Sequence, residues 1–203
     1  MTESEVEHAV TAIRAGKLAV IPTDTVYGLV CAPERADSVR ALSELKGRSP
    51  AQPIALVAAS LDVLLECVPE LGGSAATIAR ELLPGPYTLV VPNPVRRLPW
   101  LTGARPETIG VRVPAMGVGR DLLERVGVVA ATSANHHGGR DPRRLIDVPE
   151  GILSAVAAAF DGGELPGTPS TVLDLTAAEP RVLREGAVSA VEALARVAAI
   201  LDV

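Results

Sequence analysis

Aromatic residues are almost absent from this sequence of 203 residues. One Phe, one Trp and two Tyr together make up 2% of the chain. A hydrophobic core must therefore be built mainly from Ala, Val, Leu and Ile, within a hydrophobic fraction of 48%. Proteins that bind single-stranded nucleic acid by stacking bases need several aromatic side chains, so the composition disfavours that class.

Cysteine is also scarce, and Cys31 and Cys67 are too far apart for a C-x-x-C motif. Such lone cysteines are typical of reduced intracellular proteins. No uninterrupted apolar run approaches the ~20 residues that a membrane helix needs. The N-terminus, MTESEVEHAV, is acidic and lacks the apolar core of a signal peptide. We therefore expect a cytoplasmic protein with no membrane partner.

Acidic residues outnumber basic ones, which gives a net charge of −5 and a pI of about 5.3. This argues against a general electrostatic affinity for nucleic acid, although a cleft can still concentrate positive charge. Lysine is especially rare, because only Lys17 and Lys46 are lysines among the nineteen Lys and Arg residues.

Two nucleotide-binding motifs are missing as well. The sequence has no G-x-x-x-x-G-K-[ST], and GVGRDL at 117–122 lacks the third glycine of G-x-G-x-x-G. The adjacent His136 and His137 have no spaced partner that would complete a metal site.

The apolar pattern that is present predicts alternating helices and strands. Helices are expected over 4–15, 37–46, 61–67, 74–83, 117–126 and 189–201, and strands over 18–21, 54–58, 87–93, 109–114, 126–132, 170–175 and 181–185. Thr2 and Glu5 are spaced as a capping box for the first helix. Continuously apolar strands between helices indicate an α/β sheet covered by helices, and a hairpin of the last two strands makes it mixed. Without a repeat or a long linker, residues 1–203 are expected to form one domain.

Four strand-like runs end in, or carry, polar side chains: VIPTDT, TIGVRVP, VVAATSAN and PSTVLDL. Ligands of open α/β sheets bind at strand ends and the nearby loops. Each run alone is more typical of a turn whose side chains bond the local backbone. Together they favour a pocket for a small polar ligand. Asp24, within PTDT, either approaches a metal or caps a turn.

Lys46 and Arg48 flank Gly47 just past the end of a predicted helix. Arg can bind a phosphate or carboxylate with two parallel hydrogen bonds, while Lys acts as a mobile point charge. The alternative is that both cations only stabilise the C-terminal end of the helix.

Seven motifs occur in the order found in the YrdC/Sua5 family: PTDTVYGL, KGR…P, PGPYTLVV, TIGVRVP, TSAN, PSTVLDL and RVLREG. The chain resembles the short form of that family from about residue 8 to 189. The resemblance implies a twisted open α/β sheet around a concave, positively charged cavity. It also implies an L-threonylcarbamoyladenylate synthase, a nucleotidyltransferase that makes threonylcarbamoyl-AMP and pyrophosphate from L-threonine, bicarbonate and ATP. The product is used to form N6-threonylcarbamoyladenosine 37 in tRNA.

The resemblance further implies roles for individual residues. Lys46 and Arg48 match the catalytic pair that holds the ATP phosphates, and further ATP-binding positions are Thr108, Ser133, Asn135 and Arg184. The positions around L-threonine are Thr25, Arg112, Ala131 and Ser170, with Arg112 pairing the carboxylate. Mg²⁺ is expected with ATP, held mostly by nucleotide and water, and its protein ligands are unknown. The implied partners are ATP, L-threonine, bicarbonate and a downstream threonylcarbamoyl-transfer complex, while direct tRNA contact stays open.

Two positions depart from the family pattern. Ser49 stands where the family usually has Pro, and His137 replaces the usual Ser in the loop 136–142. Because these loops line the implied nucleotide cleft, a paralogue that makes another carbamoyl-adenylate stays an alternative. A non-catalytic RNA-binding protein is a second alternative, since the cavity of the family can be basic.

Overall fold

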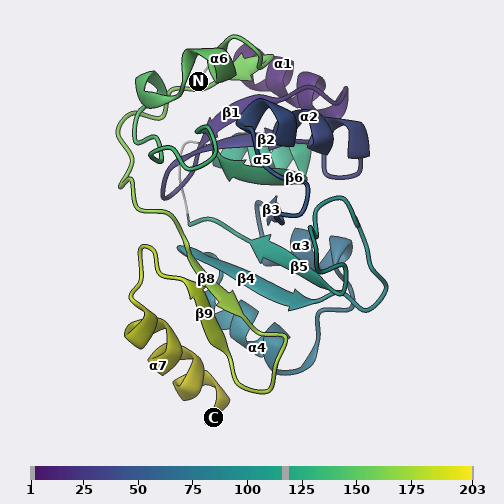
Figure 1. The fold of residues 1–203 in the computed structure, drawn as a ribbon, viewed down its shortest axis with the longest axis vertical. Coiled ribbons are helices and arrows are strands. Elements are labelled where there is room, and N and C mark those ends of the chain that lie inside the picture. The colour runs from purple at the N-terminus through teal and green to yellow at the C-terminus, as the bar shows by residue number, and fades with distance from the viewer. Residues whose placement is uncertain (1–2, 116–118, 203) are drawn as a thin grey trace.

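The computed structural model describes residues 3–115 and 119–202 and is built on a strongly twisted sheet (Figure 1). The nine strands follow the order β7–β1–β2–β6–β3–β5–β4–β8–β9. Their bounds are β1 Ala19–Pro22, β2 Tyr27–Cys31, β3 Ala55–Ala58, β4 Tyr87–Pro92, β5 Thr108–Arg112, β6 Val128–Ser133, β7 Ala158–Ala159, β8 Thr171–Asp174 and β9 Arg181–Arg184. The β1–β7, β3–β5 and β4–β8 pairs are parallel and the other neighbours are antiparallel. The expected mixed α/β sheet is thereby confirmed.

The helices begin and end close to the predicted positions. They are α1 Glu3–Arg14, α2 Ala36–Lys46, α3 Leu61–Cys67, α4 Gly73–Leu82, α5 Arg120–Val126, α6 Glu150–Leu153 and α7 Ala190–Leu201, with a 3₁₀ turn η1 at Leu145–Asp147. Thr2 of the predicted capping box and residues 117–118 of the predicted fifth helix lie outside the described residues. Ser189 caps α7 by accepting from the Glu192 amide. Among the described helices, none is long and apolar enough to cross a membrane.

The polar interruption after Pro22 is the turn of a β-hairpin. β1 and β2 pair antiparallel, with Pro22 opposite Tyr27. Thr23 organises the turn, because its hydroxyl donates to the Val26 carbonyl at 2.7 Å and accepts from the Thr25 amide at 3.2 Å. The apolar run resumes because it forms a second buried strand of the same sheet.

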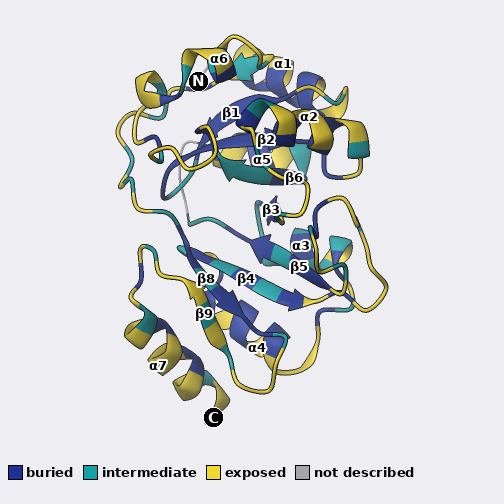
Figure 2. Ribbon diagram, viewed as in Figure 1, coloured by how far each residue is buried: buried dark blue, intermediate teal, exposed yellow. Residues whose placement is uncertain are grey.

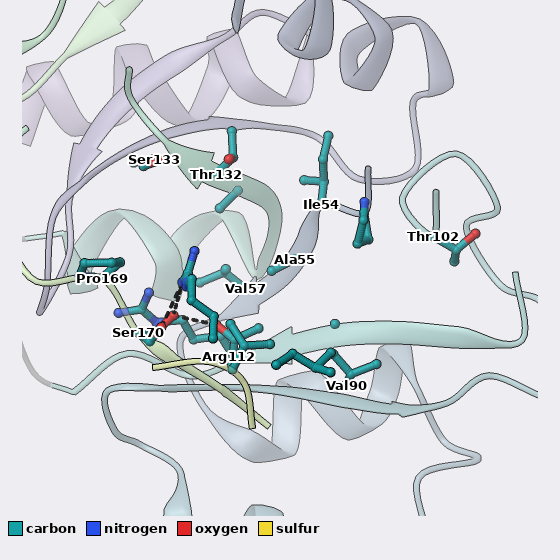
Figure 3. A pocket seen from close by; sticks show the side chains of 18 of the residues that line it. Ile54, Ala55, Val57, Val90, Thr102, Arg112, Thr132, Ser133, Pro169 and Ser170 are labelled. Carbon is teal, nitrogen blue, oxygen red and sulfur yellow. Dashed lines mark hydrogen bonds between the residues drawn. The ribbon is translucent and has the colours of Figure 1, made fainter. Parts of the chain in front are cut away.

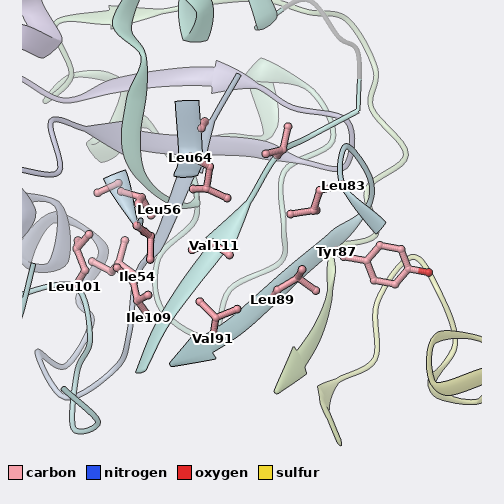
Figure 4. Close-up of a cluster of buried hydrophobic side chains, with 14 of the residues drawn as sticks. Ile54, Leu56, Leu64, Leu83, Tyr87, Leu89, Val91, Leu101, Ile109 and Val111 are labelled. Atoms are coloured by element: carbon pink, nitrogen blue, oxygen red, sulfur yellow. The ribbon is translucent and has the colours of Figure 1, made fainter. Parts of the chain in front are cut away.

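Aliphatic side chains fill the space between the sheet and the helices, as the low aromatic content predicts. The larger cluster includes Leu56, Leu89 and Val111 on one face of the sheet (Figure 4). Helices α3 and α4 pack against β3 and β4 there, and α7 packs against α4 and β9. Buried residues concentrate along the strands, whereas the helices expose their outer faces (Figure 2).

A second cluster covers part of the opposite face. In this cluster α1 and α5 pack on each other and on the strands at the β1 end of the sheet, through residues such as Ile13, Leu122 and Val129. Val30 of β2 belongs to this cluster, and Gly28, two residues earlier, faces the same side. Helices therefore lie on both faces of the sheet at this end.

Several short elements were not predicted from the sequence. They are β2, η1, α6 and β7, and all but β2 have four residues or fewer. Such lengths carry too little periodicity to detect. Both cysteines are free; Cys31 is buried and Cys67 is half-buried.

Candidate functional site

A cavity of about 440 Å³ lies on the sheet face opposite the α3–α4 side (Figure 3). The strand residues that line it include Ala55 and Val57 of β3, Thr88 and Val90 of β4, and Thr108, Gly110 and Arg112 of β5. Because alternate residues of a strand point to the same face, this pattern places the cavity on one side of the sheet. The intervening residues, such as Leu56 and Val111, are in the core.

The cavity wall is rich in arginine. Arg48, Arg105, Arg112 and Arg184 all line it, and none of the described lining residues is Asp or Glu. Burial lowers the pKa of Arg48, and the nearby Arg184 guanidinium lowers it further. Burial also lowers the pKa of Arg184, where Asp141 opposes the shift and Arg112 adds to it. Arginine still remains protonated, so the wall is suited to an anionic ligand.

Arg48 reaches the cavity from the loop that follows α2. Its Nη1 donates to Thr132 Oγ1 at 3.1 Å, and its Nη2 donates to the carbonyl of Pro53. Its Nε is buried and makes no hydrogen bond with the described residues. Gly103 (φ +61°) lets a second loop pack on this one, since a Cβ there would lie 2.4 Å from the Ala51 carbonyl oxygen.

Arg184 lies at the end of β9 and is held by the strand beside it. Its Nη2 donates to the Ser170 carbonyl at 2.8 Å and to Ser170 Oγ at 3.3 Å. Ser170 Oγ also lies 2.8 Å from Thr88 Oγ1. Gly186 makes this close packing possible, because a Cβ at that position would lie 2.2 Å from the Pro169 carbonyl oxygen.

Arg112, the last residue of β5, is paired with the turn of the β1–β2 hairpin. Its Nη2 donates to Asp24 Oδ1 and, at 2.8 Å, to Thr25 Oγ1. Asp24 Oδ2 accepts from the Ala115 amide at 3.0 Å. Asp24 therefore serves as the counterion of Arg112, a role that was not considered from the sequence.

Lys46, the last residue of α2, lies behind the wall of the cavity and is only 3% exposed. Its Nζ donates to the carbonyls of Ser133 at 2.6 Å and Asn135 at 2.9 Å, and to Asn135 Oδ1. Burial lowers the pKa of Lys46 to about 8, with Arg48 adding to the shift and Asp141 opposing it. Gly47 ends α2 in the left-handed conformation (φ +67°), as a C-cap does.

The structure brings the predicted site residues together. Seven of them line the cavity: Arg48, Thr108, Arg112, Ala131, Ser133, Ser170 and Arg184. The other three lie directly behind it and contact lining residues: Thr25 bonds Arg112, while Lys46 and Asn135 both bond Ser133. Their binding roles stay predictions. Three lining residues were not predicted from the sequence: Thr88, Thr132 and Arg105. The alternation of the predicted strand could have identified Thr88, because it lies two residues from Val90 and faces the same side of the sheet.

The described residues offer no ready cage for a metal ion. They contain no group of three or more His, Cys, Asp or Glu placed to bind one. His136 and His137 therefore belong to no such group. Asp24 already accepts hydrogen bonds from Arg112 and Ala115. A metal ion in this cavity would therefore take most of its ligands from a bound small molecule and from water.

The comparisons with known proteins all indicate the same family. Residues 11–186 match the Sua5/YciO/YrdC family model, described as "Telomere recombination". The threonylcarbamoyl-AMP synthase of Pyrococcus abyssi is 36% identical over 176 residues, covering 86% of this chain and 52% of that protein. The Halorhodospira halophila protein of the same name is 36% identical over 144 residues, covering 70% of this chain and 75% of that protein.

A solved structure has the same fold. The structure of P. abyssi Sua5 complexed with L-threonine superposes with a TM-score of 0.83 and 35% identity, covering 92% of this chain and 55% of that chain. The present chain therefore spans about half the length of the P. abyssi protein and three-quarters of the H. halophila protein.

Proposed function

The chain belongs to the Sua5/YciO/YrdC family, and we propose that it is an L-threonylcarbamoyladenylate synthase. In the first step the amine of L-threonine and bicarbonate form a carbamate and release water. A carbamate oxygen then attacks the α-phosphorus of ATP, and pyrophosphate leaves. The product, threonylcarbamoyl-AMP, would supply the threonylcarbamoyl group of N6-threonylcarbamoyladenosine 37 in tRNA.

The observation that carries this proposal is the cavity lining, which is rich in arginine and has no carboxylate side chain among its described residues. Phosphoryl transfer depends chiefly on alignment and on fixed positive charge that stabilises the phosphate oxygens. A volume of about 440 Å³ is within the usual range for small-molecule sites. The small residues Gly28, Ala55, Gly110 and Ala131 widen the space over the strands.

Within this proposal the residues divide into two groups. Arg48 and Arg184 contact the ATP phosphates, together with Thr108, Ser133 and Asn135. The Lys46 ammonium already donates hydrogen bonds to Ser133 and Asn135. To contact a phosphate, it would replace one of these acceptors with a phosphate oxygen. Around L-threonine we place Arg112, Thr25, Ala131 and Ser170, with Arg112 binding the carboxylate.

The wider setting is part of the same proposal. Mg²⁺ would enter with ATP, and residues 1–203 would act as a single catalytic domain in the cytoplasm. The product would pass to a threonylcarbamoyl-transfer complex, and direct contact with tRNA is not required for the chemistry described.

Pyrophosphate release tests the proposal and separates it from its alternatives. The purified chain should release pyrophosphate only when ATP, bicarbonate and L-threonine are all present. Higher turnover with L-serine or carbamoyl phosphate than with L-threonine would indicate a paralogue that makes another carbamoyl-adenylate. Salt-sensitive tRNA binding without any turnover would instead indicate an RNA-binding protein.

A further inference from the structure

Asp24 lies directly beside the arginine wall of the cavity and has no assigned role in the proposed reaction. Its Oδ1 accepts from Arg112 Nη2, and its Oδ2 accepts from the Ala115 amide at 3.0 Å. Only 9% of the Asp24 side chain and 11% of the Arg112 side chain are exposed. Asp24 is thus a partly buried counterion whose two oxygens are fixed by different segments of the chain.

Arg112 needs such a counterion because its surroundings are positively charged. Arg48 and Arg184 line the same cavity, without a carboxylate among the described lining residues, whereas Arg105 is itself paired with Asp174 and Glu107. Removing one partner of a buried ion pair leaves an uncompensated charge, which is strongly unfavourable. Without Asp24, repulsion from the other arginines would drive the Arg112 guanidinium away from its present place.

The contacts of Arg112 also leave donors for a ligand. Asp24 and Thr25 both accept from Nη2, so that this nitrogen is held in place. Nε of Arg112 is buried and makes no hydrogen bond with the described residues. A buried donor without an acceptor is costly, and a carboxylate bound beside Arg112 would supply the missing acceptor after a small adjustment of the side chain.

We propose that Asp24 is a positioning residue that holds the Arg112 guanidinium at the cavity wall, in the orientation that receives the carboxylate of the amino-acid substrate. This role rests on the proposed function, since it concerns the binding of L-threonine. Asp24 acts through Arg112 and does not itself contact the substrate.

Asp24→Asn tests this role with little change in shape. The amide oxygen of Asn can still accept from the Ala115 amide, but the negative charge beside Arg112 is lost. We expect the KM for L-threonine to rise at least about 10-fold, because a buried charge pair is broken, and the KM for ATP to change less than about 2-fold. Asp37→Asn is the matched control, because Asp37 pairs with Arg35 on the surface, and it should leave both values unchanged.

A double-mutant cycle shows whether Asp24 acts through Arg112. In an Arg112→Met background, which has no cation for Asp24 to hold, adding Asp24→Asn should change the KM for L-threonine by less than about 2-fold. Independent, multiplicative effects of the two substitutions would overturn the proposal. So would an Asp24→Asn variant that binds threonine normally, or one in which the KM values for both substrates rise equally as the melting temperature falls.

The failure of the proposed function gives a different result. If the wild-type chain makes no threonylcarbamoyl-AMP and calorimetry detects no binding of L-threonine, both the function and the role of Asp24 are overturned. If the wild-type chain is active and Asp24→Asn has wild-type kinetics, only the role of Asp24 is wrong.

Discussion

Lys46 and Asn135 form a buried hydrogen-bonded pair that joins the end of α2 to the loop after β6. The Lys46 ammonium donates to both the carbonyl and the side-chain oxygen of Asn135, and the His137 amide donates back to the Lys46 carbonyl at 2.8 Å. Ser133, which lines the cavity, accepts from the same ammonium at 2.6 Å. Lys46 therefore fixes part of the cavity wall without lining it.

The stability of the chain should depend on the titration of Lys46. Its pKa is about 8 in the folded chain, against 10.5 for an ordinary lysine. Below pH 8 the lysine is protonated in both states, and the cost of burying its charge is present in full. Between pH 8 and 10.5 only the unfolded chain keeps this proton, so the Lys46 contribution to the free energy of unfolding increases by about 3 kcal/mol.

Urea denaturation of the wild type and of Lys46→Met at pH 7.0 and 10.5 measures this contribution. The difference between their free energies of unfolding is compared at the two pH values, so that the titration of other groups cancels. Relative to Lys46→Met, the wild type should gain stability as the pH rises. Lys17→Met removes the other lysine of the chain, which is exposed, and should follow the wild type. A constant difference between the wild type and Lys46→Met across this range would show that the ammonium is not destabilised by burial.

Arg48→Ala should reduce activity far more than stability. The guanidinium lines the cavity and makes hydrogen bonds only to Thr132 and Pro53 among the described residues. Losing one preorganised positive group at a reacting phosphate typically costs ~100- to 1000-fold in rate. Arg40→Ala, on the exposed face of α2, is the control. Near-normal pyrophosphate release by Arg48→Ala would contradict the assignment of Arg48 to the phosphates.

Gly186→Ala should disturb the Arg184 end of the cavity. The added Cβ would lie 2.2 Å from the Pro169 carbonyl oxygen and 2.6 Å from Ser170 backbone atoms, so the segment after β9 or the segment before β8 must shift. We expect a loss of about 1–3 kcal/mol of unfolding free energy and weaker ATP binding. Gly151→Ala is the control, since its Cβ would meet nothing closer than 4.0 Å. Equal melting temperatures for the two variants would refute this steric account.

The two tyrosines provide a matched test of the loop that crosses from β7 to β8. Tyr27 Oη accepts from the Gly162 amide at 2.8 Å and donates to the Gly163 carbonyl at 2.9 Å, whereas Tyr87 Oη is buried without a hydrogen bond to the described residues. Tyr27→Phe should cost about 1–3 kcal/mol because partners are left unsatisfied. Tyr87→Phe should be neutral or slightly stabilising in the same thermal unfolding experiment, and the reverse order would be inconsistent with these contacts.

The sequence was sufficient to predict most regular elements because their signals are local. Helices with strong apolar periodicity and definite ends, such as Leu61–Cys67, were located within one residue or so. The strand order could not be obtained this way, because β6 pairs with both β2 and β3 through hydrogen bonds between distant segments. The two-residue strand β7 is too short for any pattern.

The candidate site was partly predictable for a similar reason. Polar residues at strand ends, such as Arg112 and Ser133, could be selected from the sequence and do line the cavity. The pairing of Asp24 with Arg112 could not, because 88 residues separate them and only the folded sheet brings them together. The same holds for Lys46, whose position behind Ser133 depends on how α2 packs against β2, the strand next to β6.

The most direct measurement is mass spectrometry of the products formed from ATP, L-threonine and ¹³C-bicarbonate. The account predicts threonylcarbamoyl-AMP that carries one ¹³C atom, together with pyrophosphate, and neither product when L-threonine is omitted. Hydrolysis of ATP that continues unchanged without L-threonine, or an adenylate that contains no ¹³C, would contradict it.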